Sequence, residues 1–231
     1  MRFMNSRNLV LTGFMGTGKT SVGRLVAERL RREFVDMDEL IAVREGMSIA
    51  DIFARHGESH FRALERGVCA ELAARNDLVI ATGGGTLVDP GNCLQFRNAV
   101  VICLDADVEE IARRLEGVED RPLLNAQARG TEDEGRRAGG EGREAGGEEK
   151  KANSKFLIPN FELRITNSES SHGRRERILE LLAARQVAYA QIPMHVNTSG
   201  RGIEEVAREV MDRFAGAAVS DIEARDGSYG S

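Results

Sequence analysis

The chain has 231 residues, of which 41% are hydrophobic and 30% are charged, and its formal net charge at pH 7 is −5. This length suits one α/β domain with additional polar material. The acidic balance excludes a nucleic-acid-binding surface as the main function, because such a surface needs a positive field. No apolar run approaches the length that spans a membrane, so we expect neither nucleic acid nor a membrane as a partner.

The cysteines and the first residues indicate the cellular compartment. Cys69, Cys93 and Cys103 are odd in number, widely spaced and embedded in apolar stretches. We expect reduced thiols in the core rather than a disulfide framework or a zinc site. The segment 1–7 is too short and too polar to be a secretory leader. These features predict a cytoplasmic protein.

Apolar runs and helical periodicity alternate along the chain. Apolar runs predict strands at residues 9–12, 34–36, 78–81, 100–104 and 195–197. Helical spacing predicts helices at residues 20–32, 49–56, 58–74, 108–115, 178–189 and 203–214. Strands that alternate with helices form a parallel sheet, because each crossover returns the chain to the same edge of the sheet. The predicted fold class is therefore α/β, with a five-stranded parallel sheet and helices on both faces.

The alternation of strands and helices stops after Leu124. Residues 130–151 contain no aliphatic residue larger than alanine, so this segment cannot bury enough surface to offset the entropy of ordering it. We predict that it is disordered. We also expect an apolar island at residues 156–161 to dock on the domain, a polar loop at residues 168–173 and a mobile tail at residues 215–231.

A phosphate-binding loop lies between the first predicted strand and the first predicted helix. Residues 13–20 read GFMGTGKT and match the pattern G-x-x-x-x-G-K-[ST]. The glycines let backbone N–H groups curl around a phosphate, and the helix N-terminus adds the positive end of its dipole. Lys19 would reach the outer phosphates and Thr20 would offer its hydroxyl to Mg²⁺. The alternative is a glycine-rich turn that binds nothing.

Three further polar clusters follow the loop. Asp36 and Asp38 come at the carboxyl end of the second strand, where ligands bind in open α/β sheets, and strand alternation would send their side chains in different directions. Gly83–Gly85 end the third strand and leave backbone N–H groups accessible to a ligand. Arg62 and Glu65 are three residues apart on one helix face, so the carboxylate can hold the guanidinium. A helix cap, a tight turn and an ordinary surface ion pair are the respective alternatives.

Taken in order, these clusters resemble shikimate kinase. The resemblance rests on GFMGTGKT, FVDMD, SIADIFARHGESHFRALE, ATGGGTLVDP, RRL, DRPLL and ARQVAYAQ, and it covers residues 9–124 and 178–214. It implies a three-layer fold of the nucleoside-monophosphate-kinase type. The implied activity is phosphorylation of the 3-hydroxyl of shikimate by ATP, on the route to chorismate and the aromatic amino acids.

The resemblance also implies roles for individual residues. Thr20 would bind one Mg²⁺ directly and Asp36 would hold its water shell. Catalysis would involve Lys19, Asp38 and Arg121. ATP would contact Gly16, Thr17, Gly18, Lys19, Thr20, Ser21, Arg114, Arg121 and Arg201. Shikimate would contact Asp38, Arg62, Gly83, Gly84, Gly85 and Arg185, with its ring against Phe53, Phe61, Pro122 and Leu123.

The implied organisation is a single domain at residues 1–214 that acts as a monomer. Its core would comprise residues 8–125 and 176–214, separated by a disordered lid insertion at about 126–174. Other functions stay open at this point. They are another small-molecule kinase of the same fold, such as a gluconate or nucleoside-monophosphate kinase, a non-catalytic shikimate- or nucleotide-binding regulator, and a phosphate-loop switch protein.

Overall fold

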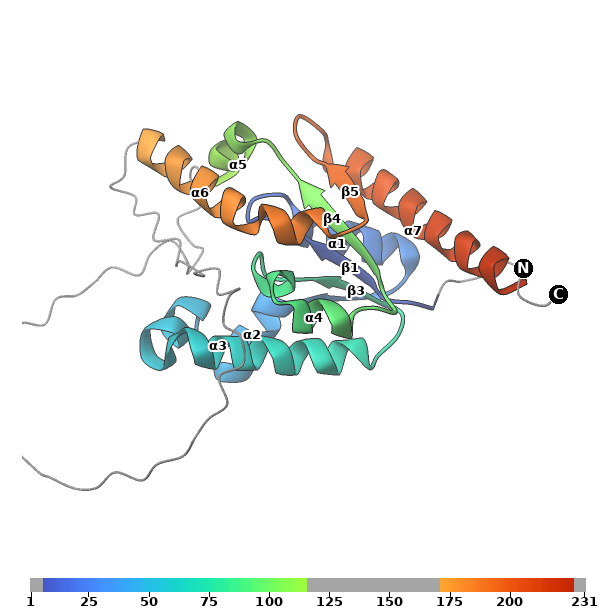
Figure 1. Cartoon of the computed structure of the whole chain (residues 1–231), viewed down its shortest axis with the longest axis horizontal. Helices are drawn as coiled ribbons and strands as arrows, with labels where there is room; N and C mark the ends of the chain where they lie inside the picture. Colours follow the sequence, from blue (N-terminus) through green and yellow to red (C-terminus); the bar gives the residue numbers. More distant parts are fainter. Residues whose placement is uncertain (1–5, 116–170, 227–231) are drawn as a thin grey trace, which may run out of the picture.

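The computed structural model describes residues 6–115 and 171–226, and its centre is a five-stranded sheet (Figure 1). The strands are β1 (Leu9–Thr12), β2 (Glu33–Asp36), β3 (Leu78–Ala81), β4 (Val100–Asp105) and β5 (Met194–Asn197). They lie in the order β2-β3-β1-β4-β5, and every neighbouring pair is parallel. The predicted α/β fold with a parallel sheet is confirmed.

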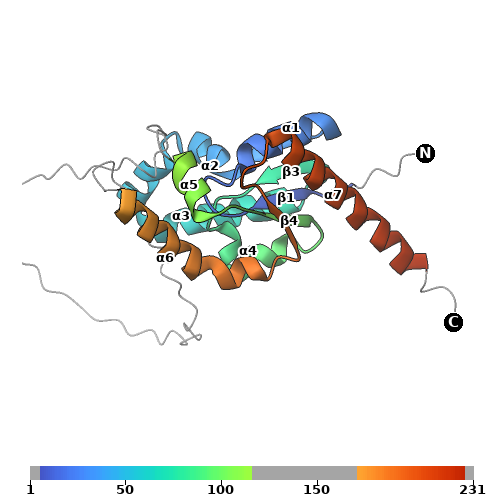
Figure 2. The same cartoon turned by 90° about the horizontal axis from the view of Figure 1, so that it is seen from above.

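Helices cover both faces of this sheet (Figure 2). One face packs against α1 (Lys19–Leu30) and α7 (Ile203–Asp226). The opposite face packs against α2 (Met37–Glu45), α3 (Ile49–Ala73), α4 (Pro90–Gln95), α5 (Val108–Leu115) and α6 (Ser171–Ala190), with a short 3₁₀ turn, η1 (Thr86–Val88), before α4. Among the helices described, none is both long and apolar enough to cross a membrane.

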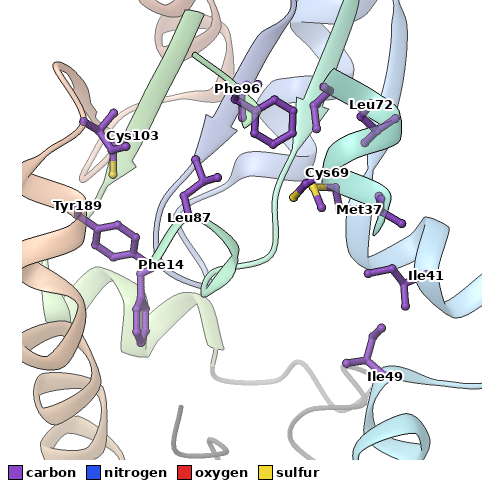
Figure 3. Packing of buried hydrophobic residues seen from close by; sticks show 14 of the residues in the cluster. Phe14, Met37, Ile41, Ile49, Cys69, Leu72, Leu87, Phe96, Cys103 and Tyr189 are labelled. Atoms are coloured by element: carbon purple, nitrogen blue, oxygen red, sulfur yellow. The ribbon is translucent and has the colours of Figure 1, made fainter. Parts of the chain in front are cut away.

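The sheet divides the core into two layers because strand side chains alternate between its faces. In the central strand β1, Val10 joins the cluster under α2 to α6, part of which is seen in Figure 3, whereas Leu9 and Leu11 join the cluster under α1 and α7. All three are fully buried. A strand buried on both faces needs a continuous apolar run, as the sequence supplies here.

The strand order determines where a ligand binds. β1 lies between β3 and β4, so the chain passes to opposite sides of β1 to reach its two neighbours. Loops that leave the carboxyl ends of such strands separate and leave a crevice between them. The segments that end β1, β2 and β3 therefore meet at one edge of the sheet, and they are the segments that the sequence singled out.

Several elements differ from their predicted bounds. Helix α2, the turn η1 and helix α4 were not predicted. The first helix ends at Leu30, because Arg31 adopts a left-handed conformation with φ 56°. Helix α6 begins at Ser171, inside the predicted polar loop. The prediction that the last helix ends at Phe214 was also wrong, since α7 continues to Asp226.

The predicted division of the helix pair at 49–56 and 58–74 corresponds to a kink inside α3. Gly57 has φ 78° and ψ 173°, which is far from helical geometry. Side chains with a Cβ avoid this region of backbone space, and glycine does not. The two halves of α3 therefore point in different directions, and Ser48 caps the first half by accepting a hydrogen bond from the backbone N–H of Asp51 at 3.1 Å.

Candidate active site

The phosphate loop connects β1 to α1 and needs glycine at its first position. Gly13 has φ 131°, and a Cβ placed there would lie 2.2 Å from the backbone oxygen of Leu104 on β4. Gly16 and Gly18 also have positive φ, of 78° and 93°. The loop can therefore wrap around a phosphate only because no side chain obstructs it, and it ends at the N-terminus of α1.

Lys19 lies folded over this loop. Its Nζ donates hydrogen bonds to the backbone oxygens of Gly13 at 3.0 Å and Phe14 at 2.9 Å. The buried Thr17 hydroxyl donates to the same Phe14 oxygen at 2.8 Å. The ammonium group is thus held over the space that the loop encloses, where a phosphate would sit.

Thr20 and Asp36 form a pair of oxygen ligands beside the loop. The Thr20 hydroxyl donates to Asp36 Oδ2 at 2.7 Å, and Asp36 Oδ1 accepts from the backbone N–H groups of Asp38 and Glu39. Asp36 therefore caps α2 and is fixed in orientation. A hydroxyl and a carboxylate at this distance fit a hard cation such as Mg²⁺, which prefers oxygen ligands and keeps several waters.

Asp38 lies in the first turn of α2, not on the strand, so strand alternation is not what separates it from Asp36. Its carboxyl is packed closely against Gly83: a Cβ at Gly83 would lie 2.8 Å from Asp38 Oδ1 and 3.3 Å from Glu65 Oε1. Burial, followed by the charges of Asp36 and Glu65, raises the pKa of Asp38 to about 6, while Lys19 and Arg62 act in the opposite direction.

Glu65 positions Arg62 on the second half of α3. Glu65 is 2% exposed, accepts a hydrogen bond from the Thr86 hydroxyl at 2.7 Å and forms a short ion pair with Arg62 Nη1. Arg62 also pairs with Glu58 at 3.3 Å. This ion pair is not an ordinary surface pair, because the carboxylate is buried and anchored from both sides. Because Glu65 fixes the orientation of the Arg62 guanidinium, the N–H groups that are not bonded to Glu65 or Glu58 point in a fixed direction.

Arg185 reaches the same edge of the sheet from α6. Its side chain is only 9% exposed, its Cζ lies 5.5 Å from the ring centre of Phe14, and a Cβ at Gly84 would lie 3.2 Å from its Nη1. The Nη1 atom is buried and has no hydrogen-bond partner among the described residues. Tyr189, one turn further along α6, donates to the backbone oxygen of Gly84 at 2.5 Å. Arg185 is thus placed beside the glycine turn despite the long interruption before α6.

Of the two further arginines predicted to contact ATP, Arg114 lies beside the phosphate loop and Arg201 does not contact it. Arg114 Nη1 donates to the backbone oxygen of Gly16 at 3.2 Å and to the Thr198 hydroxyl at 3.0 Å. Arg201 instead turns toward α7, where it pairs with Glu205 and Glu209. A cavity of about 700 Å³ lies next to this region and is lined by residues 106–110, Arg113, Ser199 and Gly200.

The structure therefore brings most of the predicted site residues to one edge of the sheet. Those gathered there are the phosphate loop with Ser21, Asp36, Asp38, Arg62, Gly83–Gly85, Arg114 and Arg185. Phe53 and Phe61 contact each other with their ring centres 4.6 Å apart and their planes tilted by 37°. Arg121, Pro122 and Leu123 lie outside the described residues, so their predicted roles stay predictions.

Sequence reasoning missed the support that Thr86 and Glu58 give to the substrate side of the site. Thr86 begins η1 and joins Glu65, and Asn92 Nδ2 in turn donates to the Thr86 backbone oxygen at 3.0 Å. The sequence carried one usable signal for Glu58, which precedes Arg62 by one helical turn. No short-range pattern connects Thr86 with Glu65, because α3 and η1 are joined through β3.

The fold and the site are those of a phosphate-loop kinase of small molecules. They combine a parallel sheet, a phosphate loop after β1, a pair of oxygen ligands suited to a metal ion, and two oriented arginines. Comparison with known proteins identifies the family. The family model for shikimate kinase matches residues 15–144. A shikimate kinase of Geobacter metallireducens is 37% identical over 211 residues, which cover 91% of this chain and 93% of that protein.

Further relatives agree. A shikimate kinase of Caldanaerobacter subterraneus is 36% identical over 209 residues, covering 90% of this chain and 96% of that protein. A solved structure of shikimate kinase from Acinetobacter baumannii in complex with shikimate aligns with a TM-score of 0.68 and 26% identity, over 93% of this chain and 96% of that one. The chain belongs to the shikimate kinase family.

Proposed function

We propose that this chain transfers the γ-phosphoryl group of ATP to the 3-hydroxyl of shikimate, giving shikimate 3-phosphate and ADP. Membership of the shikimate kinase family supports the reaction and its place on the route to chorismate and the aromatic amino acids. The single observation on this chain that carries the substrate assignment is Arg185. A buried guanidinium nitrogen that no described group satisfies needs an acceptor, and a substrate carboxylate supplies one.

Arg62 and Arg185 would grip that carboxylate together. They come from different helices. Glu65, which holds Arg62, lies against Gly83, and Arg185 lies against the adjacent Gly84. Planar guanidinium groups bind a carboxylate through two parallel hydrogen bonds, which fixes the orientation of the ring that carries it. The absence of side chains at the two glycines would leave room for the ring above them.

Asp38 would accept a hydrogen bond from the hydroxyl that is phosphorylated. A loose phosphoryl-transfer transition state needs alignment of the attacking oxygen more than it needs a strong base. The raised pKa of Asp38, about 6, still leaves the carboxyl ionised at neutral pH and better able to take the proton as the new bond forms. Lys19 would neutralise the charge that develops on the transferred group, because its Nζ is already held over the loop.

Thr20 and Asp36 would hold Mg²⁺, Thr20 directly and Asp36 through water. When bound, the ion neutralises charge on the phosphate oxygens. On the nucleotide side, Arg114 would stack on the adenine ring, because its guanidinium is fixed between Gly16 and Thr198. We propose that Arg121 adds a second positive charge to the transferred group and that Arg201 borders the base.

A coupled assay of ADP release tests this function. Shikimate with Mg²⁺ and ATP should produce rapid turnover, whereas ATP alone or ATP with gluconate should give only background hydrolysis. Mass spectrometry of the product should show one added phosphate on shikimate. Equal turnover with gluconate, or shikimate-independent ATP hydrolysis at the same rate, would show that the substrate assignment is wrong.

A further inference from the structure

A cysteine, an aspartate and a histidine converge at the carboxyl ends of β4 and β5. Cys103 and Asp105 are two residues apart on β4 and so point to the same face of the sheet. His195 on β5 is the register partner of Cys103. Parallel partners share a face, so the three side chains meet beside α6, where Figure 3 shows Cys103 near Tyr189. None of these three residues has a role in the phosphoryl transfer proposed above.

The three side chains lie close enough together to share one cation. His195 Nδ1 lies 2.7 Å from Asp105 Oδ2, and Cys103 Sγ lies 3.4 Å from Asp105 Oδ1. The ligand atoms of the three residues all lie within 4.8 Å of one another. Tetrahedral zinc with bonds of 2.0 to 2.3 Å spaces its ligand atoms roughly 3.3 to 3.8 Å apart. To admit the ion, the contact between His195 Nδ1 and Asp105 Oδ2 would have to open by roughly 0.6 Å. Any separation near the 4.8 Å limit would have to close by up to roughly 1.3 Å.

The imidazole of His195 is already oriented for this role. Its Nε2 lies 2.9 Å from the backbone oxygen of Ile192, which can only accept a hydrogen bond, so Nε2 carries a proton and Nδ1 is the nitrogen directed at the trio. A second hydrogen bond of this kind fixes the tautomer and orientation of histidines that bind metals. This contact lies outside the trio and would persist when an ion is bound.

We propose that Cys103, Asp105 and His195 bind a thiophilic divalent cation such as Zn²⁺, with water as the fourth ligand. A thiolate, an imidazole and one carboxylate oxygen are ligands that Zn²⁺ accepts, whereas Mg²⁺ prefers oxygen alone and would stay with Thr20 and Asp36. Binding would release the thiol proton of Cys103 to solvent, together with the proton shared between His195 Nδ1 and Asp105.

Access and charge both bear on this site. Cys103 is fully buried, whereas Asp105 and His195 have side chains that are 44% and 36% exposed, so an ion would enter from their side. Burial, followed by the charge of Asp105 and the hydrogen bond to it, raises the pKa of the Cys103 thiol and opposes thiolate formation, while the positive charge of Lys19 lowers this pKa.

The site also adjoins the loop that we expect to border the nucleotide base. The backbone oxygen of Asp105 accepts hydrogen bonds from the Thr198 N–H at 2.8 Å and the Thr198 hydroxyl at 3.0 Å. Thr198 is in turn held by Arg114. An ion bound by Cys103, Asp105 and His195 would join the carboxyl ends of β4 and β5 beside this loop, so binding should stabilise the fold.

Titration of the full chain with Co²⁺, without nucleotide or Mg²⁺, tests the proposal, because a cobalt–thiolate bond absorbs in the near ultraviolet. We expect one equivalent of Co²⁺ to produce this absorption, Zn²⁺ to abolish it by displacement, and Zn²⁺ at about 100 times its Kd to raise Tm by roughly 5 °C or more. Cys103→Ala and His195→Gln should each weaken binding by about 10-fold or more.

Two matched variants control for other ligands. Cys93→Ala removes a cysteine elsewhere in the fold, and His60→Gln removes a histidine whose ring centre lies 5.0 Å from that of His56. Both should keep the cobalt–thiolate absorption. The proposal is overturned if folded parent protein gives no such absorption in excess Co²⁺, or if the absorption survives Cys103→Ala. If Cys103→Ala does not fold, His195→Gln provides the test, because the His195 side chain is half-exposed. Unchanged Co²⁺ affinity in His195→Gln would then overturn the proposal.

Discussion

Asp38 is a carboxyl group held where its charge is unfavourable. Burial and the neighbouring carboxylates of Asp36 and Glu65 raise its pKa from 3.8 to about 6. The folded chain therefore binds this proton more tightly than the unfolded chain does. The free energy of unfolding should therefore fall as pH rises from 3.8 to about 6. Above about pH 6, Asp38 is ionised in both states and should cause no further change in the free energy of unfolding.

Asp38→Asn removes the charge and keeps the shape of the side chain. Well above pH 6 we expect the variant to be more stable than its parent by about 1–3 kcal/mol, with the two converging as pH falls toward the ordinary pKa of a carboxyl group. Turnover should fall by roughly 100-fold or more. Thermal unfolding at several pH values and the ADP-release assay measure both effects.

The exposed Asp212 on α7 provides the control for this substitution. Asp212→Asn should leave turnover unchanged, because this side chain is exposed on α7. The kcat/KM of the parent should fall below about pH 6 as Asp38 takes up its proton. Equal stability of parent and Asp38→Asn at every pH, or near-normal turnover in the variant, would contradict the role given to Asp38.

Lys19 is the residue that we expect to stabilise the phosphoryl group during transfer. Lys19→Ala removes the positive charge over the phosphate loop together with the contacts to Gly13 and Phe14. We expect a loss of turnover on the order of 100-fold or more, with the fold retained, because the charge acts on the transferring group. Steady-state kinetics and circular dichroism check the two parts of this expectation.

Arg24→Ala is the matched control for Lys19→Ala. Arg24 lies on the same helix, α1, and its exposed side chain pairs with Glu39 on the surface. Its loss should change turnover less than twofold, because both side chains of this pair are exposed and surface pairs contribute about 0–1 kcal/mol. Near-normal turnover in Lys19→Ala would remove the lysine from the mechanism.

At the scale of elements, α3 and α6 determine the substrate side of the site. Arg185→Ala and Arg62→Ala should each weaken shikimate binding by about 2 kcal/mol, or roughly 30-fold, and leave ATP affinity almost unchanged. The reason is that each removes one of two guanidinium groups from a partly desolvated carboxylate. Separate calorimetric titrations of shikimate and ATP measure this difference.

Arg175→Ala supplies the control on α6. Arg175 is exposed and pairs with Glu109 of α5 at 3.0 Å, away from the glycine turn. Its loss should leave shikimate affinity within twofold of the parent value. If Arg185→Ala and Arg175→Ala behave alike, the carboxylate is bound by another group and α6 does not contribute to the substrate site.

The kink in α3 offers a second test at this scale. A Cβ at Gly57 or at Gly67 would meet nothing within 4 Å, so the two positions on α3 differ in backbone conformation and not in available space. Gly57→Ala should destabilise the fold by about 1–3 kcal/mol, because alanine disfavours φ 78° with ψ 173°. Gly67→Ala should stabilise it by about 0.5–1 kcal/mol, since alanine is the better helix former.

Chemical denaturation of the two glycine variants measures both values. Because the kink lies before Arg62 and Phe61, Gly57→Ala should also raise the KM for shikimate, whereas Gly67→Ala should not. A gain in stability at both positions would mean that α3 can straighten at Gly57 without penalty. The kink would then have no part in orienting the first half of the helix.

At the scale of the whole molecule, sequence patterns predicted the sheet and much of the site. All five strands and the phosphate loop were predictable, because buried parallel strands leave continuous apolar runs and a phosphate loop has few alternative sequences. Helix α2 was missed although Asp36, with Glu39 three residues later, resembles a capping box. Likewise, Asp89 followed by Pro90 is a helix-start signal that precedes α4.

The remaining differences depend on contacts that short sequence windows do not contain. The extension of α7 runs through Gly216, a residue that on propensity alone favours a helix end. The position of Arg185 depends on the packing of α6 against α5 and η1 and on Tyr189, which bonds to Gly84. The trio of Cys103, Asp105 and His195 joins two strands that are distant in sequence, so counting cysteine spacings could not reveal it.

The lid insertion that the sequence predicts falls within residues 116–170, which lie outside the described part of the chain, so its disorder stays a prediction. Arg175 pairs with Glu109, so the start of α6 is held against α5 by contacts within the described residues. Loop-closure entropy changes by only about 0.6 kcal/mol per doubling of length, so the insertion should be removable.

Replacing residues 127–168 with a short Gly/Ser linker tests this prediction at the scale of the whole molecule. The replacement keeps Arg121 and stops before Ser171, where α6 begins. We expect the core to fold with little change in Tm and shikimate-dependent turnover to stay within about tenfold, with any change in the steps of lid closure or product release. A folded, ATP-binding variant without turnover would instead show that the insertion has a required function, and restoring residues 156–161 alone would then test whether that apolar island supplies it.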